Sequence, residues 1–425
     1  MKVLYLPAYF YPEKAASTYL NDNRNQAFAD AGFKTIVYVP TPCRGVSLEE
    51  RKEYCTSKHR IDSYYDGMIT VHRFSMFAEG NNSILRAVRY SLCWINQLCR
   101  SSREKDIDCI YISSTPPIQG LLGAILRKSK KIPFVYNLQD IFPDSLVGTG
   151  MAKRDGLLWK VGRKIEDFTY RNADKIIVIS QDFKRNIMAK GVPEAKIEVV
   201  YNWVDENAIT PVKDEDNELF EEFGISRDKF RVVYAGNLGN AQNIELILNA
   251  AQSLKDNSQI EFIIFGNGGL EDEIKSAIAE NHLTNLKILP LQPYERVAKV
   301  YGIGNVCIVA CKPGLGGAAM PSKTWSIMSS GRAVLASFDE GELQEIVSGT
   351  SPASSGRPCG VFTHAGQLDE FVSAIVDLSN RPCLCEEYGR NGRQFILDNL
   401  TREVGTQKYV DVIKSVVSKD SKFKK

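Results

Sequence analysis

The sequence predicts an α/β protein with two doubly wound domains. Three observations lead to this fold class. The chain has 425 residues, which at about 150 residues per domain gives two or three domains. Apolar residues make up 44% of the chain and charged residues 24%, as in ordinary globular proteins, so a mainly disordered chain is excluded. Short β-branched runs alternate with helical patterns, and this alternation restarts near the middle of the sequence.

The first half contains seven short apolar runs that are typical of buried parallel strands, and helical patterns separate them. These runs are KVLYLPA, TIVYVP, MITVHRF, CIYISS, PFVYNLQ, KIIVIS and IEVVYN. After the first run, residues 17–31 predict a helix. Gly32 follows it, and glycine there favours the left-handed conformation that ends many helices. The first half is therefore expected to form one parallel sheet covered by helices.

The second half repeats the pattern with five strand-like runs, which are RVVYAG, IEFIIFG, KILPL, VCIVA and AVLAS. Helices are expected over residues 244–255, 270–280, 294–301 and 322–330.

From this pattern we expect one domain over residues 1–206 and a second over residues 207–395. We also expect a carboxy-terminal helix over residues 396–425 that packs back toward the first domain. In a pair of Rossmann-like domains, a ligand is expected in the cleft between them, at the carboxyl ends of the strands.

Composition narrows the classes of ligand. Lys and Arg number 53 and Asp and Glu 51, so the formal net charge is only +2 and a nucleic-acid-binding surface is not expected. The 10 cysteines show no disulfide framework and the 4 histidines are scattered, so we expect reduced thiols and no metal or other cofactor. MKVLYLPAYF does not resemble a signal peptide, and no run reaches about 18 apolar residues. These features favour a cytoplasmic protein without a membrane span.

Two segments that follow predicted strands contain small residues. Residues 7–17 follow the first strand and include Glu13, Lys14 and Ser17. Backbone N–H groups there would suit an anion, but the spacing alone favours an ordinary loop with Ser17 as the helix N-cap. Residues 234–240, YAGNLGN, place two glycines after a buried strand. Glycine lets the backbone approach a phosphate closely, although this segment is not a complete phosphate-binding motif.

Two further segments carry charged side chains at strand ends. Residues 314–331 place Lys323 in the first turn of a helix after a glycine-rich loop. A lysine there opposes the helix dipole, so a nearby anion would explain it; a surface lysine on a capped helix is the alternative. Residues 137–144 interrupt the end of a buried strand with polar residues. Asp140 is placed to accept a proton, or a hydrogen bond from a sugar hydroxyl. The alternative is that Asp140 or Asp144 caps the next helix.

Taken together and in this order, the motifs resemble the bacterial family 4 retaining glycosyltransferases with the GT-B fold. The resemblance covers essentially the whole chain and is specific only as a joint match. The matching segments are YLPAYFYPE, GFKTIVYVPTP, NLQDIFPDS, RNADKIIVIS, GVPEAKIEVVYNWVD, VVYAGNLGNAQNIE, IEFIIFGNGG and PSKTWSIMSSGRAVLAS. Within the family, the chain is most similar to the L-fucosamine transferase type of O-antigen and capsule synthesis.

The resemblance implies a retaining, hexosyltransferase-type reaction without a metal. A sugar would move from a nucleotide-diphosphate sugar, such as UDP-linked N-acetyl-L-fucosamine, to an undecaprenyl-linked or oligosaccharide acceptor in surface polysaccharide synthesis. The first domain would hold the acceptor, with Asp140 as a catalytic residue and Glu13, Lys14 and Ser17 in an acceptor-side loop.

The resemblance also implies that the second domain holds the donor. Its expected donor-binding residues are Gly236, Asn237, Gly239, Leu291 near the base, Ser322, Thr324 and, as a ribose contact, Glu342. The N–H groups of Ser322, Lys323 and Thr324 would face the diphosphate. Lys323 would act in catalysis by stabilising the charge that grows on the diphosphate as the glycosidic bond breaks.

The sequence departs from the family pattern at four positions. Two glutamates that the family commonly carries correspond here to Ala318 and Ser326, and its usual Arg and Lys correspond to Asn237 and Gln242. Neutralisation of the phosphates would therefore depend more on Lys323 and on the backbone.

Two other functions fit the same fold. A non-hydrolysing nucleotide-sugar 2-epimerase would act on the donor alone. A non-catalytic, donor-binding partner subunit is suggested by the missing glutamates at 318 and 326.

Two segments also suggest contact with the anionic inner face of the plasma membrane, as a peripheral protein. Residues 83–103 and 153–164 mix basic and apolar side chains at near-helical spacing. The basic residues include Arg86, Arg89, Arg100, Arg103, Lys153 and Arg154. The alternative is a pair of ordinary amphipathic helices that pack on the sheet, with their arginines in water.

Overall fold

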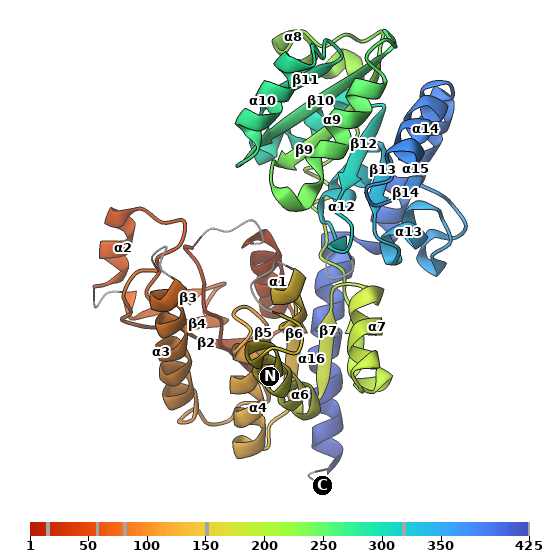
Figure 1. The fold of residues 1–425 in the computed structure, drawn as a ribbon. Coiled ribbons are helices and arrows are strands. Elements are labelled where there is room, and N and C mark those ends of the chain that lie inside the picture. Colours follow the sequence, from red (N-terminus) through yellow and green to blue (C-terminus); the bar gives the residue numbers. More distant parts are fainter. Residues whose placement is uncertain (14–17, 57–58, 80–82, 149–152, 317–319, 424–425) are drawn as a thin grey trace. The chain divides into compact units, whose positions relative to one another are not determined.

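The computed structural model describes residues 1–425 apart from 14–17, 57–58, 80–82, 149–152, 317–319 and 424–425. The chain forms two compact units (Figure 1). Unit 1 contains Met1–Tyr201 and Glu403–Lys425, and unit 2 contains Asn202–Arg402. The first boundary thus lies five residues before the expected one at 206/207. The last helix, α16 (Arg402–Phe423), begins after residue 396, because residues 396–399 complete α15 (Pro382–Asn399).

Unit 1 is built on one eight-stranded sheet with the order β3-β4-β2-β1-β5-β6-β7-β8. Its strands are β1 (Lys2–Tyr5), β2 (Lys34–Pro40), β3 (Ile61–Tyr64), β4 (Ile69–Phe74), β5 (Cys109–Ser113), β6 (Phe134–Leu138), β7 (Lys175–Val178) and β8 (Ile197–Val199). β3 runs antiparallel to β4, and the other pairs are parallel. The chain builds outward from β1 through β2 and β4, then returns to the other side of β1 at β5. The topological switch point of unit 1 therefore lies between β1 and β5.

The helices of unit 1 are α1 (Thr18–Asp30), α2 (Leu48–Tyr54), α3 (Ser83–Ser101), α4 (Gln119–Lys130), α5 (Asp144–Gly148), α6 (Leu157–Asn172), α7 (Gln181–Ala189) and α16. α1 ends where the sequence predicts: Gly32 has φ +76°, the left-handed conformation that closes a helix. The core on one side of the sheet contains fully buried Leu4, Ile110, Leu122 and Phe134. Burial of these strand and helix residues fixes the layered packing.

Gly123 in α4 allows this helix to lie directly on β6. A Cβ atom at position 123 would stand 2.3 Å from two ring atoms of the fully buried Phe134. We predict that Gly123→Ala lowers stability, because overpacking a rigid core costs roughly 1–3 kcal/mol and exceeds the gain in helix propensity of about 1 kcal/mol. The measurement is the thermal unfolding midpoint of the full chain. Gly269→Ala is the control, since a Cβ there meets nothing within 4 Å; equal midpoints for the two variants would contradict the packing argument.

Unit 2 contains a six-stranded parallel sheet with the order β11-β10-β9-β12-β13-β14. Its strands are β9 (Phe230–Asn237), β10 (Ile260–Asn267), β11 (Leu286–Pro290), β12 (Val306–Ala310), β13 (Ala333–Phe338) and β14 (Gly360–His364). The helices are α8 (Leu219–Glu222), α9 (Ile244–Ser253), α10 (Glu271–Glu280), α11 (Val297–Ile303), α12 (Lys323–Ser329), α13 (Glu342–Val347), α14 (Leu368–Ser379) and α15. The order reverses between β9 and β12, so the switch point of unit 2 lies there. The expected fold class of two doubly wound α/β domains is confirmed.

Candidate functional site

Two segments of unit 2 that the sequence singles out meet at its switch point. Residues 236–240 end β9 and follow it, whereas residues 314–324 follow β12. β9 and β12 are parallel neighbours, so their carboxyl ends share one edge of the sheet. The loops also touch directly, because the Lys312 N–H donates to the Ala241 carbonyl at 3.0 Å. The carboxyl edge at a switch point is where doubly wound domains bind ligands.

Lys323 and Gly236 are neighbours at this edge. The Lys323 ammonium lies 4.1 Å from the centroid of the Tyr234 ring, in a cation–π geometry. A Cβ atom on Gly236, which has φ +142°, would stand 3.1 Å from the Lys323 Nζ. The Tyr234 hydroxyl donates to the Asn237 carbonyl at 2.7 Å. A glycine at 236 therefore leaves the room that the lysine occupies, and the tyrosine ring supports the ammonium.

Burial lowers the pKa of Lys323 to about 8. The residue as a whole is partly exposed, but its ammonium rests on the fully buried Tyr234 ring and has lost part of its hydration. No carboxylate lies within 4.0 Å of it in the described part of the chain. A bound diphosphate would supply the missing negative charge and favour the protonated lysine.

We predict that nucleotide affinity falls with rising pH because of this lysine. Below its pKa of about 8, Lys323 is charged before binding. Above that pH, binding must also take up a proton, so affinity declines by at most about tenfold per pH unit. Titration calorimetry with UDP at about pH 7 and about pH 9 measures the effect. Lys323→Arg stays charged across this range and should flatten the decline; an equally steep decline in that variant would assign the titration to another group.

The other residues that are expected to bind the donor have varied environments. The Asn237 amide donates to the Gln242 side chain at 3.4 Å, so the two uncharged replacements contact each other. Ser322 is exposed immediately before α12, but the Thr324 N–H donates to the Pro321 carbonyl at 3.0 Å. This N–H is therefore already used, against the expectation that it faces a diphosphate. α12 has seven residues and Ser326 lies within it, whereas Ala318 falls outside the described residues.

Asp339, which the sequence analysis missed, holds the glycine-rich loop. Its carboxylate accepts the N–H groups of Gly314 at 3.0 Å and Gly316 at 2.7 Å. Asp339 directly follows β13, the strand beside β12, and this position is the only sequence signal for its role. Leu291 follows the edge strand β11 and is exposed, and Glu342 is buried at the start of α13. Their expected contacts with base and ribose stay predictions.

In unit 1, Asp140 lies in the loop that follows β6. Its carboxylate accepts a hydrogen bond from the Ser145 hydroxyl at 3.1 Å. Burial raises the pKa of Asp140, although this bond and the Ile141 N–H oppose the rise. Asp144, by contrast, begins α5 and pairs with Lys190 at 2.7 Å. Of the two aspartates, Asp140 has no cation within 4.0 Å among the described residues and is the better candidate for a proton or hydroxyl acceptor.

Glu13 lies in the loop that follows β1, and its carboxylate is hydrogen-bonded to backbone groups. Its buried carboxylate accepts backbone N–H groups from Phe10 at 3.1 Å, Cys43 at 2.9 Å and Arg44 at 3.0 Å. It therefore ties the loop after β1 to the loop after β2. Lys14 and Ser17, the other expected members of the acceptor-side loop, lie outside the described residues.

A buried polar cluster that sequence reasoning missed lies at the end of β6, around Asn137. The Asn137 amide donates to the Tyr111 hydroxyl at 2.9 Å, which also accepts from Arg24 at 2.9 Å. Tyr409 of α16 donates to the Asn137 side-chain oxygen at 3.1 Å, and Gln139 donates to the same oxygen at 2.8 Å. The last helix thus helps fix the strand end from which the Asp140 loop begins.

Within the described ranges, no group of three or more His, Cys, Asp or Glu side chains has an arrangement that would hold a metal ion. None of the helices in the described ranges is long and apolar enough to cross a membrane.

Comparisons with known proteins add to this geometry. Residues 25–208 match the family model described as Glycosyltransferase Family 4, and residues 215–395 match that of Glycosyl transferases group 1. The chain is 26% identical over 323 residues to a probable glycosyltransferase, WbjE, of Pseudomonas aeruginosa, covering 75% of this chain and 77% of that protein. It is 27% identical over 296 residues to the putative colanic acid biosynthesis glycosyl transferase WcaI of Escherichia coli K12, covering 68% and 70%.

Among solved structures, the fold is similar to that of Anabaena HepE in complex with UDP. The TM-score is 0.70 with 16% sequence identity, covering 98% of this chain and 100% of that chain. HepE is also known in complex with UDP-glucose.

Proposed function

Since the chain belongs to glycosyltransferase family 4 and has the GT-B fold, we propose that it transfers a sugar from a UDP-linked donor to a lipid-linked or saccharide acceptor. The observation that carries this proposal is the meeting of Gly236 and Lys323 at the switch point of unit 2. The HepE complexes with UDP and UDP-glucose support a uridine nucleotide as the donor class. WcaI, named for colanic acid biosynthesis, supports a place in surface polysaccharide synthesis.

The chemistry of the donor site follows from its charge. Breaking the glycosidic bond leaves a nucleoside diphosphate with an additional negative charge on the leaving oxygen. An ammonium that is already desolvated interacts with that charge more strongly than one in water, and its position is set before the reaction starts. Lys323 would therefore stabilise the transition state more than the intact donor. We further propose that the reaction retains the anomeric configuration and that the transferred sugar is N-acetyl-L-fucosamine.

A panel of nucleotides and nucleotide sugars tests the donor assignment by thermal shift. A ligand that binds only the folded protein raises its melting temperature, by an amount that grows with its concentration relative to its Kd. We expect UDP and one or more UDP-sugars to raise it more than GDP, ADP or CMP. Equal shifts with all four nucleotides, or none with any, would contradict the proposal.

The two alternative functions predict different products. A 2-epimerase would convert the donor without any acceptor, which NMR of the nucleotide sugar would detect as a second isomer. A non-catalytic donor-binding subunit would bind UDP but transfer nothing to a lipid-linked acceptor. Sugar transfer that requires the acceptor excludes both.

An exposed apolar stripe on α3 favours contact with a membrane surface. Leu85, Val88, Leu92 and Ile95 are each between 40% and 53% exposed. Their spacing places them on one face of the helix. Trp94 and Leu98 instead pack against the core, as ordinary amphipathic packing predicts. Thus α3 has an inner apolar face and a second, outer one.

One residue of the expected basic surface is misplaced. Arg89 is fully buried; its Nε donates to the Phe77 carbonyl at 3.0 Å and its guanidinium reaches the Cys43 sulfur at 3.0 Å. It is therefore a core residue and cannot contact lipid. Arg86, Lys153 and Arg154 are exposed and remain candidates.

We predict salt-sensitive binding of the protein to vesicles that contain anionic lipid. Each basic residue near such a surface contributes about 1 kcal/mol. Arg86→Glu, Lys153→Glu and Arg154→Glu together should therefore weaken co-sedimentation by at least roughly tenfold. Arg89→Glu is excluded as a probe, since a buried glutamate there would disturb folding. Absence of vesicle binding at low salt would rule this surface out.

A further inference from the structure

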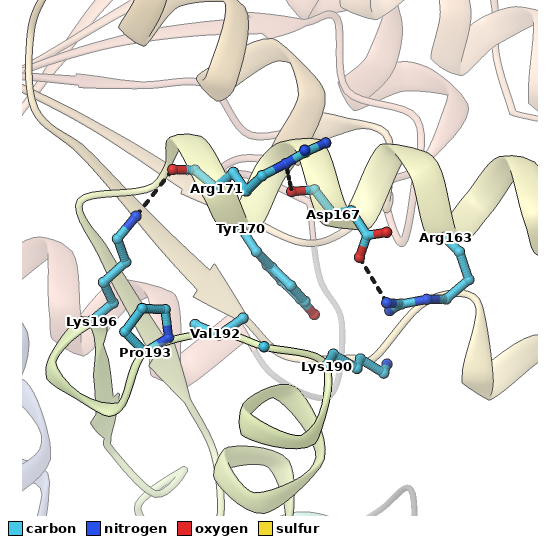
Figure 2. Close-up of a pocket in the computed structure, with 9 residues that line it drawn as sticks. Arg163, Asp167, Tyr170, Arg171, Lys190, Val192, Pro193 and Lys196 are labelled. Atoms are coloured by element: carbon cyan, nitrogen blue, oxygen red, sulfur yellow. Dashed lines mark hydrogen bonds and ion pairs between the residues drawn. The ribbon is translucent and has the colours of Figure 1, made fainter.

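A pocket of about 470 Å³ lies in unit 1 between α6 and the segment that follows α7. It is lined by four cationic side chains, Arg163, Arg171, Lys190 and Lys196, and by the carboxylate of Asp167. Figure 2 shows the Tyr170 side chain at the centre, with Lys196 on one side of it and Arg163 on the other. Its described lining contains none of the predicted donor or acceptor residues.

Two of the four cations are neutralised by nearby carboxylates. Lys190 pairs with Asp144 at 2.7 Å and with Glu166 at 3.0 Å. Arg163 pairs with Glu166 and, at 2.7 Å, with Asp167. Such pairs hold both side chains in place at the pocket wall, since each is bound by two oxygens.

The other two cations, Arg171 and Lys196, have no carboxylate within 4.0 Å in the part of the chain that the structure describes. The Lys196 ammonium donates to the carbonyls of Arg171 at 3.0 Å and Ala173 at 2.8 Å (Figure 2 shows the first of these bonds). The Arg171 Nε donates to the Asp167 backbone carbonyl at 3.2 Å, and its terminal nitrogens have no hydrogen-bond partner among the residues that the structure describes. Burial lowers the pKa of Lys196, and the nearby charge of Asp174 only partly opposes this shift. Among the described residues, neither cation therefore has a carboxylate as a direct partner.

The first turns of α6 carry exposed apolar and basic residues. Leu157, Leu158 and Val161 are 81%, 54% and 47% exposed. Lys153, Arg154, Lys160 and Lys164 are exposed around them. A surface that combines large exposed apolar side chains with basic ones matches the boundary between the headgroups and acyl chains of an anionic membrane.

We propose that this pocket binds the phosphate-bearing headgroup of an anionic phospholipid, while Leu157, Leu158 and Val161 contact the acyl-chain boundary. Arg171 and Lys196 donate to the phosphate oxygens, while Arg163 and Lys190, held by their carboxylates, form part of the pocket wall. The inference deepens the membrane contact in the proposed function, because it gives that contact a defined lipid site. It does not depend on the identity of the donor or acceptor sugar.

Vesicle co-sedimentation of the full chain tests the pocket. The wild type should bind phosphatidylglycerol vesicles and not phosphatidylcholine vesicles. Arg171→Gln with Lys196→Gln should weaken binding by roughly tenfold to thirtyfold, and Arg171→Gln alone by severalfold. The single variant leaves the Lys196 side-chain hydrogen bonds untouched, so it keeps the test valid if the double variant is unstable. Lys52→Gln with Arg60→Gln is the matched control, since it removes the same charge from exposed positions elsewhere in unit 1.

Each outcome decides the proposal. Loss of vesicle binding in the pocket variants and not in the control supports the proposal. Equal loss in both would show that binding depends on surface charge in general and not on this pocket, and would contradict the proposal. Glycerol 3-phosphate distinguishes the sources of the anion: if it binds the wild type in calorimetry while phosphatidylglycerol vesicles do not, the pocket serves a free metabolite and the lipid proposal is wrong. Thermal shift with UDP on the same variants separates this question from catalysis. An unchanged UDP shift with lost vesicle binding supports the lipid site, whereas vesicle binding without any UDP shift contradicts only the transferase proposal.

Discussion

Lys323→Ala is expected to lower turnover by roughly tenfold to a thousandfold, the range for losing one group that stabilises developing charge. The ammonium lies on the Tyr234 ring beside Gly236, at the carboxyl edge of β9 and β12. No described carboxylate within 4.0 Å neutralises it, and Asn237 at the end of β9 and Gln242 in the segment after it are uncharged. The loss should appear mainly in kcat, because the leaving diphosphate carries more charge in the transition state than in the bound donor.

Steady-state kinetics with the donor identified by thermal shift measures this effect. Lys255→Ala serves as the control, since it removes an exposed lysine from the same unit. A folded Lys323→Ala variant with wild-type kcat would remove the lysine from the reaction, and with it the main argument for the donor site.

Asp140→Asn is expected to lower kcat/KM for the acceptor by about a hundredfold, the lower part of the range for groups that assist proton transfer. The asparagine keeps the size of the side chain and can still accept the Ser145 hydroxyl, which now lies 3.1 Å from the carboxylate. It cannot take up a proton. The Kd for UDP should stay unchanged, because the residue lies in unit 1 and the predicted donor residues lie in unit 2.

Asp66→Asn provides the same chemical change at an exposed position of unit 1. It should leave both measurements at wild-type values. If Asp140→Asn weakens UDP binding as much as acceptor use, Asp140 belongs to the donor site; if it changes neither, the residue serves only to hold its loop.

The alternation of apolar runs and helical patterns predicts most of the fold because each buried parallel strand carries its own signal. Two strands were missed, and both lie at the edge of a sheet. β3 is IDSY, and its only aliphatic residue, Ile61, is 62% exposed. β14 is GVFTH and begins with glycine. Edge strands pair on one side only and tolerate a less hydrophobic sequence, so β3 and β14 lack a clear apolar run. The other two edge strands, β8 and β11, carry such runs and were predicted.

A residue of the candidate site can be predicted when the pattern that marks it lies within one short segment of the sequence. Lys323 and Gly236 stand in recognisable loop-and-helix patterns, and the parallel sheet brings them together. Arg89 was misassigned because its burial depends on contacts with the chain near Cys43 and Phe77. The Asp339 carboxylate accepts hydrogen bonds from a loop that lies more than twenty residues earlier in the sequence. Contacts between distant segments leave no local pattern.

The hydrogen bond between Tyr409 and Asn137 joins residues 272 positions apart, within a unit whose chain is discontinuous. Unit 2 is one continuous stretch, Asn202–Arg402, and is synthesised completely before residue 403 leaves the ribosome. Unit 1 begins first and finishes last, because α16 supplies Tyr409 to the cluster of Arg24, Tyr111 and Asn137. A nascent or truncated chain that stops at Arg402 thus contains every residue of unit 2, yet leaves the buried Asn137 oxygen of unit 1 without its tyrosine donor.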